Sequence, residues 1–387
     1  MPPLPEPSAP ALEHSHAVRQ AIVAEIADSG GWMPFARYME LALYAPGLGY
    51  YSAGLDKFGA GGDFVTAPEI SALFGQAVAR QAAQVLRETG GDVLEIGAGS
   101  GKLALDLVLE LERAEQLPAR YCILELSADL RQRQQARIEQ AAPHLLERFT
   151  WLDALPEKFT GFIVGNEVLD AMPVHLVLWR DGEVFERGVS LLDEHLHWSD
   201  RPLGEGELLR QARALPPMGF SAGADYLAEI NLAAQGFMRS LGNMLEHGLV
   251  LMLDYGFGAS EYYHPQRSQG TLMCHYRHHA HADPFHLPGL QDITAHVDFS
   301  AMARAGGEAG MDLLGYANQA NFVINCGLID LLARVSPENP AAYLPLVNQA
   351  QKLMSPAEMG ELFKAIALGK CLTPPLVGFT RGNRALA

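Results

Sequence analysis

Three glycines at alternate positions follow a short apolar run, Val93-Leu94-Glu95-Ile96, and precede a helical pattern over 102–113. The glycines are Gly97, Gly99 and Gly101. A parallel strand that ends in such a turn presents its carboxyl end to a nucleotide-like ligand, and glycine lets the backbone approach that ligand closely. A dinucleotide site favours the spacing GxGxxG. Here the third glycine comes one residue early, and Glu95 stands two residues before the first, so the pattern favours S-adenosylmethionine.

Acidic residues also end the next two predicted strands. Glu125 lies near the end of the strand 120–126, and Asp153 follows the strand 149–152. A carboxylate at the first of these positions can accept both ribose hydroxyls of a cofactor, and the second acid would lie near the adenine amino group. Each acid could instead cap the helix that follows it. Three strand-end acids in register, Glu95 included, favour the binding interpretation.

A further acidic segment, Asn166-Glu167-Val168-Leu169-Asp170, follows the fourth predicted strand. In this position an acceptor atom would meet a methyl donor. A carboxylate can orient a cationic nitrogen through paired hydrogen bonds, and it can take a proton from that nitrogen. We therefore predict catalytic roles for Glu167 and Asp170. Asn166 and Glu167 can also serve as the cap and first turn of a helix, and both interpretations can hold together.

Four separated segments resemble the MidA-like methyltransferases, a family related to the mitochondrial complex I assembly factor. They read GDFVTAPEIS at 62–71, EIGAGSG at 95–101, NEVLDAMP at 166–173 and GLQDITAHVDF at 289–299. The similarity runs from about residue 15 to the C-terminus. It implies a class I S-adenosylmethionine-dependent enzyme. The expected fold is α/β, with a doubly wound, mostly parallel sheet, an N-terminal helical cap and inserted substrate-side segments.

The same resemblance implies that the acceptor is arginine in a protein, with symmetric dimethylarginine as the product and Glu167 facing the guanidinium. His296 lies in a segment loosely similar to the Thr-His-Trp loop of arginine methyltransferases, and it is the third predicted catalytic residue. It could hold an acid, accept a proton or serve only the loop structure. The residues expected to hold S-adenosylmethionine are Thr66, Pro68, Glu95, Gly97, Gly99, Gly101, Glu125, Leu126, Asp153 and Asn166.

Composition restricts the classes of partner. The 387 residues carry a formal charge of −17, which disfavours nucleic acid and anionic membrane surfaces, and no apolar run approaches the ~20 residues of a membrane span. The His-rich segment 275–286 lacks paired zinc-ligand spacing, so no metal is predicted. The four cysteines form no CxxC pair, and the N-terminus lacks the pattern of a signal peptide, so we predict a cytoplasmic location. The oligomeric state stays open.

Alternating strand and helix patterns organise the chain around one parallel sheet. We expect a disordered tail over 1–13, a helical cap and glycine-rich loop over 14–88, a cofactor-binding core over 89–256 with an insertion near 172–223, a substrate-side loop segment over 257–310, and strands and helices that complete the core over 311–387. Asp181-Gly182 predicts a hairpin. Further predictions are a helix over 69–87 capped by Thr66, helices over 225–245 and 356–368, and a strand over 376–380.

Three other functions stay open at this point. The chain could methylate a different acceptor, it could be a non-catalytic assembly chaperone that keeps the fold, or it could be an NAD-dependent oxidoreductase. Tyr50 and Tyr51, in the N-terminal glycine-rich loop, could close over a cofactor or merely anchor that loop.

Overall fold

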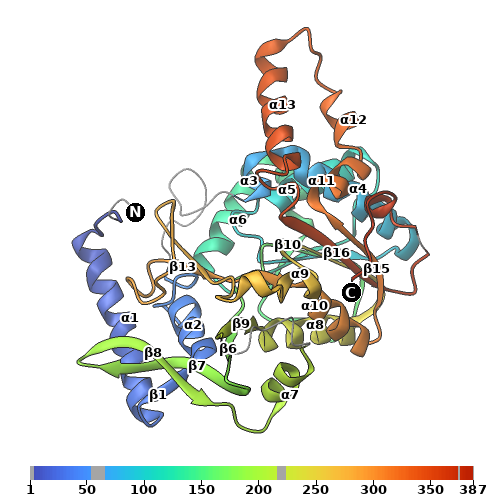
Figure 1. The fold of residues 1–387 in the computed structure, drawn as a ribbon. Coiled ribbons are helices and arrows are strands. Elements are labelled where there is room, and N and C mark those ends of the chain that lie inside the picture. The colour runs from blue at the N-terminus through green and yellow to red at the C-terminus, as the bar shows by residue number, and fades with distance from the viewer. Residues whose placement is uncertain (1–3, 54–65, 216–223, 374, 387) are drawn as a thin grey trace. The chain divides into compact units, whose positions relative to one another are not determined.

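The computed structural model describes residues 4–53, 66–215, 224–373 and 375–386 (Figure 1). The chain forms two compact units. Unit 1 comprises residues 1–64, 169–236 and 259–298, and unit 2 comprises residues 65–168, 237–258 and 299–387. Each unit is described by itself below.

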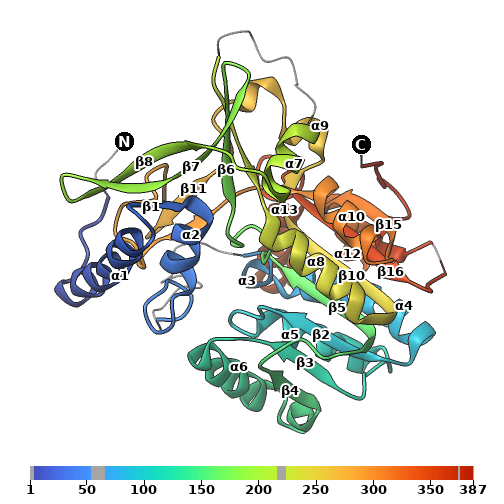
Figure 2. The same ribbon diagram turned by 90° about the horizontal axis from the view of Figure 1, so that it is seen from below.

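Unit 2 contains the predicted doubly wound, mostly parallel sheet. Its strands follow the order β15-β16-β10-β5-β2-β3-β4; Figure 2 shows β4, β3, β2 and β5 side by side. Five of these strands run parallel, and β16 runs antiparallel to both of its neighbours. The strand order reverses between β2 and β5, the kind of position where open α/β sheets bind ligands. The bounds are β2 Asp92–Ile96, β3 Tyr121–Leu124, β4 Phe149–Leu152, β5 Phe159–Asn166, β10 Leu245–Phe257, β15 Asp312–Asn318 and β16 Phe363–Lys370.

The helices of unit 2 bury apolar faces against this sheet, with Phe74, Leu107, Phe162 and Leu251 fully buried in the shared core. In Figure 1, α12 and α13 project away from the sheet. The helix bounds are α3 Ala67–Ile70, α4 Ala72–Thr89, α5 Lys102–Arg113, α6 Ala128–Ala141, α10 Phe299–Glu308, α11 Gln319–Asn325, α12 Leu328–Leu332 and α13 Pro340–Met354; α8, Leu232–Met244, crosses residue 236, where the chain passes from unit 1 to unit 2.

The predicted helix over 69–87 is two helices, α3 and α4, separated by Ser71 in an extended conformation. Thr66 makes no side-chain capping bond, whereas the Ser71 side chain accepts from the Leu73 amide at 3.3 Å. A serine hydroxyl competes with helical backbone bonding and favours caps. The prediction of one helix capped by Thr66 was therefore wrong.

Three further predictions in the second half of the chain were wrong. Residues 225–245 form strand β9, Tyr226–Ile230, followed by α8. Residues 363–368 of the predicted helix over 356–368 belong to β16, Phe363–Lys370, and Val377–Phe379 is a short 3₁₀ helix rather than a strand. The β16 sequence contains two alanines, two lysines and a leucine, which favour helices locally. Its pairing with β10 and β15 overrides that preference, because a central strand is buried on both faces.

Unit 1 contains two helices at the N-terminus and two antiparallel sheets. Asp181 and Gly182 both have positive φ, 51° and 82°, which confirms the predicted hairpin between β6 and β7. Helix α1 starts at Ala9, so residues 9–13 are helical instead of disordered, with the Ser8 side chain accepting from the Ala11 amide. The sheets are β1-β7-β6-β9, with β8 on β7, and β12-β11-β13.

The remaining bounds are α1 Ala9–Asp28, α2 Phe35–Tyr44, α7 Glu207–Ala214, α9 Ala259–Tyr262, β1 Trp32–Pro34, β6 His175–Arg180, β7 Glu183–Leu192, β8 His195–Pro202, β11 Met273–Tyr276, β12 His279–His281, β13 Asp292–Thr294 and β14 Val297–Asp298.

Candidate functional site

The glycine turn after β2 adopts a backbone that requires glycine. Gly97, Gly99 and Gly101 have φ values of 63°, 51° and 77°, in the left-handed region that side chains disfavour. A Cβ on Gly97 would lie 3.3 Å from Cγ2 of Val168, and one on Gly101 would lie 3.1 Å from Cγ of Gln134. The turn is therefore packed between the β5 corner and α6, and it is shaped for close approach of a ligand to the backbone.

Glu125 follows β3 and is tied to the glycine turn by Gln134. Its carboxylate accepts from the Ser127 amide at 3.0 Å and from Nε2 of Gln134 at 3.1 Å. The same Nε2 donates to the Gly99 carbonyl at 2.9 Å. Burial raises the pKa of Glu125, and the Ser127 and Gln134 donors act against that rise. Gln134 thus holds the acid and the turn in one arrangement.

Leu126, which follows Glu125, and Asp153, which follows β4, are both exposed, but one is apolar and the other is charged. Leu126 is 79% exposed, which is unusual for a large apolar side chain and leaves it free to pack against a flat ring. The Asp153 side chain is 93% exposed and forms an ion pair with Nη2 of Arg131 at 2.8 Å. Arg131 also donates to the Glu125 carbonyl, so it links the ends of β3 and β4.

Glu95 points into the core of unit 2. Its carboxylate is buried and accepts from the Tyr121 hydroxyl at 2.5 Å. Burial raises the pKa of Glu95 to about 7; the Tyr121 hydrogen bond acts against that rise, and nearby Glu125 adds to it. A cofactor-binding role for Glu95 stays a prediction.

The segment that begins at Thr66 reaches the glycine turn through Glu69. Thr66 is half-buried, Pro68 is buried at the start of α3, and Glu69 accepts a hydrogen bond from the Ser100 hydroxyl. The structure therefore brings the predicted residues Thr66 and Pro68 into the same region as the turn.

The corner after β5 holds Glu167 in a strained backbone. Glu167 has a φ of 52°, a conformation that costs a residue with a side chain about 1–3 kcal/mol. Its amide donates to the Leu253 carbonyl at 2.8 Å, and the next amide, of Val168, donates to the buried carboxylate of Asp254 at 3.1 Å. Nδ2 of Asn166 donates to the Glu167 carboxylate at 3.1 Å. Strain of this kind is typical of functional sites, and the Val168–Gly97 contact places the corner beside the glycine turn.

Asp170 belongs to unit 1 and is buried near two tyrosines. Tyr44 and Tyr51 stack with ring centroids 5.4 Å apart, and the Tyr51 hydroxyl donates to Asp292 at 2.9 Å. Burial, together with the charges of Asp292 and Asp170, raises the pKa of both tyrosines. Unit 1 thus gathers two buried carboxylates and two aromatic rings.

His296 lies close to this group along the backbone, because the amide of its neighbour Ala295 donates to the Asp170 carbonyl at 3.0 Å. The His296 amide donates to the Thr271 hydroxyl at 3.0 Å. Thr271 is in turn fixed by the buried Glu229, which accepts from its amide at 2.7 Å and its hydroxyl at 3.1 Å. A catalytic role for His296 stays a prediction.

Sequence reasoning assigned no role to two residues of these sites and missed one pairing. Gln134 falls on the buried face of α6 with Leu130 and Ile138, and a polar residue at that spacing signals a buried hydrogen-bonding role. Asp254 directly follows the apolar run 249–253, and an acid in that position at the end of a strand could have identified it. No local signal pointed to the pairing of Tyr51 with Asp292.

Two features are absent from the described part of the chain. No group of three or more His, Cys, Asp or Glu residues there is arranged to hold a metal ion. No helix of that part combines the length and the apolar character that a bilayer crossing requires.

Comparisons with known proteins agree on the chemistry. A family model described as "Putative S-adenosyl-L-methionine-dependent methyltransferase" matches residues 77–317. A Burkholderia thailandensis protein, whose crystal structure holds S-adenosylhomocysteine, is 50% identical with a TM-score of 0.95, over 99% of each chain.

Two named relatives are more distant. A Drosophila melanogaster protein is 27% identical, over 94% of this chain and 87% of its own, and it is named protein arginine methyltransferase NDUFAF7 homolog, mitochondrial. A Danio rerio protein named protein arginine methyltransferase NDUFAF7, mitochondrial, is 25% identical, over 95% and 94% of the two chains.

The names of these relatives contradict the prediction of a cytoplasmic location. That prediction rested on the cysteines and on the lack of a signal-peptide pattern, and all four cysteines are free. Free thiols indicate a reducing environment, however, and do not identify one compartment.

Proposed function

We propose that this chain, which belongs to the family of S-adenosyl-L-methionine-dependent methyltransferases, transfers methyl groups to arginine side chains of a protein. Its cofactor is S-adenosylmethionine, and its unit 2 has the class I methyltransferase-like α/β fold. The names of the Drosophila and Danio relatives support arginine as the acceptor.

The residues of unit 2 fit that cofactor. Side chains at Gly97 and Gly101 would crowd Val168 and Gln134, Glu125 offers a carboxylate fixed by Gln134, and Leu126 offers an exposed apolar surface. We assign the glycine turn to close backbone contact with the cofactor, Glu125 to its ribose and Leu126 to its adenine ring. When bound, S-adenosylmethionine supplies a methyl group on a positively charged sulfur.

The observation that carries the acceptor assignment is the carboxylate of Glu167 beside the glycine turn. A guanidinium has a pKa above about 12 and stays charged at neutral pH. A carboxylate can hold it through two parallel hydrogen bonds and localise its charge, leaving one nitrogen directed toward the methyl donor. On gaining a methyl group that nitrogen loses its proton, which the Glu167 carboxylate would accept. Asn166 orients the Glu167 carboxylate by donating to it, and Asp254 fixes the strained corner by accepting from the Val168 amide. Such pre-set positioning is the main contribution a protein makes to methyl transfer.

Unit 1, considered by itself, carries a second group of residues whose chemistry suits a cationic side chain. Its stacked Tyr44 and Tyr51 present aromatic faces, and Asp170 and Asp292 supply negative charge beside them. Guanidinium groups stack on aromatic rings and pair with carboxylates. This chemistry favours a cationic acceptor over a neutral one.

The test is transfer of a labelled methyl group from S-adenosylmethionine to proteins of a cell extract, followed by acid hydrolysis and separation of the amino acids. We expect label in methylated arginine. Glu167→Gln should lower the transfer rate at least about 100-fold, because it removes the charge that pairs with the guanidinium. Glu157→Gln, an exposed carboxylate of the same unit, is the matched control and should keep the rate of the unmodified protein.

Calorimetry with S-adenosylhomocysteine separates donor binding from transfer. Glu167→Gln should bind this product about as tightly as the unmodified protein. Label in another residue or in a small molecule would overturn arginine as the acceptor. Normal transfer by Glu167→Gln would overturn the role of that carboxylate, and product binding without any transfer would indicate a non-catalytic protein.

A further inference from the structure

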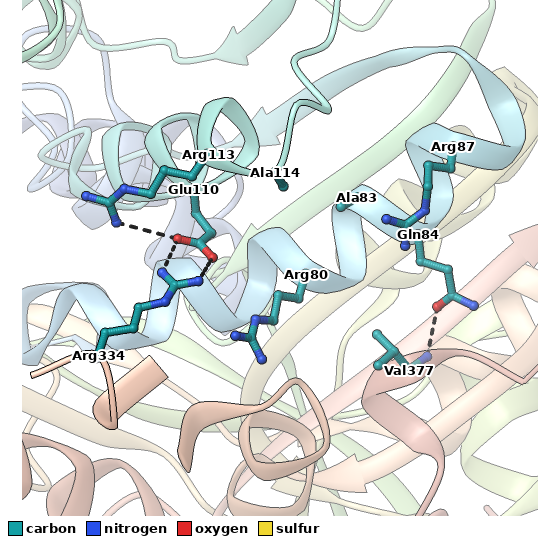
Figure 3. Close-up of a pocket in the computed structure, with 9 residues that line it drawn as sticks. All are labelled: Arg80, Ala83, Gln84, Arg87, Glu110, Arg113, Ala114, Arg334 and Val377. Atoms are coloured by element: carbon teal, nitrogen blue, oxygen red, sulfur yellow. Dashed lines mark hydrogen bonds and ion pairs between the residues drawn. The ribbon is translucent and has the colours of Figure 1, made fainter. Parts of the chain in front are cut away.

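A pocket of about 510 Å³ in unit 2 is lined by four arginines and one glutamate (Figure 3). None of its lining residues is among those predicted to hold the cofactor. The volume is that of a small-molecule site. The chain as a whole has 28 Lys and Arg against 45 Asp and Glu. A pocket with an excess of positive charge is therefore unusual in a chain whose net charge is negative.

Two of the arginines serve the fold. Nη1 of Arg80 donates to the carbonyls of Cys326 and Gly327, each at 3.2 Å, where α11 ends. Arg334 pairs with Glu110 through two bonds of 2.7 Å, and Glu110 is only 4% exposed. Figure 3 shows the guanidiniums of Arg334 and Arg113 converging on this carboxylate. Glu110 is therefore already neutralised by Arg334.

The other two arginines retain unused charge. Arg87 makes no hydrogen bond or ion pair with the part of the chain that the structure describes. Nη1 of Arg113 lies 3.6 Å from Glu110, and its side chain is 60% exposed. Both stand in the last turns of their helices, α4 and α5, where the helix dipole favours positive charge. The helix dipole explains why each helix ends in an arginine, but it does not explain why Arg87 and Arg113 both line the same pocket.

The order of residues along α4 and α5 leaves space in the pocket beside its arginines. Arg80 and Arg87 are two helical turns apart and so share one face of α4. Ala83, between them, and Ala114, after Arg113, are small and leave the space that longer side chains would fill. Arg87 is thereby exposed to a ligand, and Arg113 keeps part of its charge for one because Arg334 already pairs with Glu110.

We propose that this pocket binds a small multivalent oxyanion, a molecule with two or more phosphate or carboxylate groups, between Arg87 and Arg113. The guanidinium fork matches both kinds of group and binds them in a bidentate manner. The pocket lies at the C-terminal end of α5, roughly 17 Å along that helix from the glycine turn at its start. It is thus separate from the cofactor site and independent of the proposed methyl transfer.

The test is calorimetric titration with inorganic pyrophosphate and, separately, with citrate. The unmodified protein should bind at least one of them, and the tighter of the two identifies the oxyanion class. Arg87→Gln and Arg113→Gln should each weaken binding about tenfold or more, because each loses charge-assisted hydrogen bonds. Arg87→Lys, which keeps the charge without the fork, should lose less. Arg304→Gln, an exposed arginine of the same unit outside the pocket, should bind as the unmodified protein does.

Four results would overturn the proposal. The first is that the unmodified protein binds neither anion, and the second is that Arg304→Gln loses as much anion affinity as the pocket variants. The third is that Arg87→Gln has a lower thermal stability but an unchanged anion affinity. The fourth is that the protein binds a glutamate-rich peptide and neither small anion. The third would leave the arginines a structural role only, and the last would indicate a protein partner. Binding of S-adenosylhomocysteine should be the same in all variants, which keeps this outcome distinct from that of the methyltransferase test.

Discussion

Replacing Glu95 with glutamine should make this protein more stable at neutral pH, although the glutamate is buried and hydrogen-bonded. Burial raises the pKa of Glu95 from 4.5 to about 7. The folded protein therefore binds this proton more tightly than the unfolded chain does. The resulting contribution to stability is complete below pH 4.5 and is lost as the pH rises through 7.

The magnitude follows from the difference between the two pKa values. A difference of about 2.5 pH units corresponds to about 3 kcal/mol, as an upper value for a fully buried group. Glutamine carries no charge, and its oxygen can still accept from the Tyr121 hydroxyl. The free energy of unfolding of Glu95→Gln, relative to the unmodified protein, should thus rise by up to about 3 kcal/mol between about pH 5 and pH 8.

The assay is urea-induced unfolding followed by tryptophan fluorescence at several pH values across that range. Comparing the two proteins at each pH removes the contributions of the other titrating groups. Glu157→Gln, an exposed glutamate of the same unit, should show the pH profile of the unmodified protein. Parallel profiles for Glu95→Gln and the unmodified protein would refute the inference that burial keeps Glu95 protonated near neutral pH.

Three further substitutions test the hydrogen bonds behind the two sites. Gln134→Met should lower the free energy of unfolding by about 3 kcal/mol, since it leaves the buried hydrogen-bond partners of Gln134 unsatisfied. It should also weaken S-adenosylhomocysteine binding, and an unchanged affinity in calorimetry would contradict the positioning role of Gln134. Asp254→Ala should destabilise unit 2 by about 2–4 kcal/mol and lower kcat more than it raises KM, because Val168 loses its acceptor; an unchanged kcat would argue against this. Tyr51→Phe should cost about 2 kcal/mol in urea unfolding by removing its bond to Asp292, and a cost near zero would count against that bond.

Local patterns predicted the part of the fold that surrounds the glycine turn. Strands β2 and β4 have the predicted bounds, since short apolar runs bounded by polar turn residues fold in the same way wherever they pair. Strands β9 and β16 were predicted as helices. Their residues are compatible with both structures, and only pairing with distant strands decides between them.

The candidate sites show the same division. Gly97, Gly99 and Gly101 were identified from spacing, because a left-handed turn needs glycine whatever lies around it. The carboxylate beside that turn, Glu167, was identified from its place at a strand end. The backbone strain of Glu167 was not, since it depends on contacts with a strand that lies far along the chain.

The methyl donor can thus be inferred without the structure, because a strand, a glycine turn and strand-end acids within about 60 residues of one another carry that information locally. Only the folded chain shows how the Glu167 carboxylate is held, which residues fix Glu125 to the turn, and which tyrosines meet the buried acids of unit 1. Those contacts join residues from separate segments, and a hydrogen bond across such a distance leaves no periodic trace in the sequence.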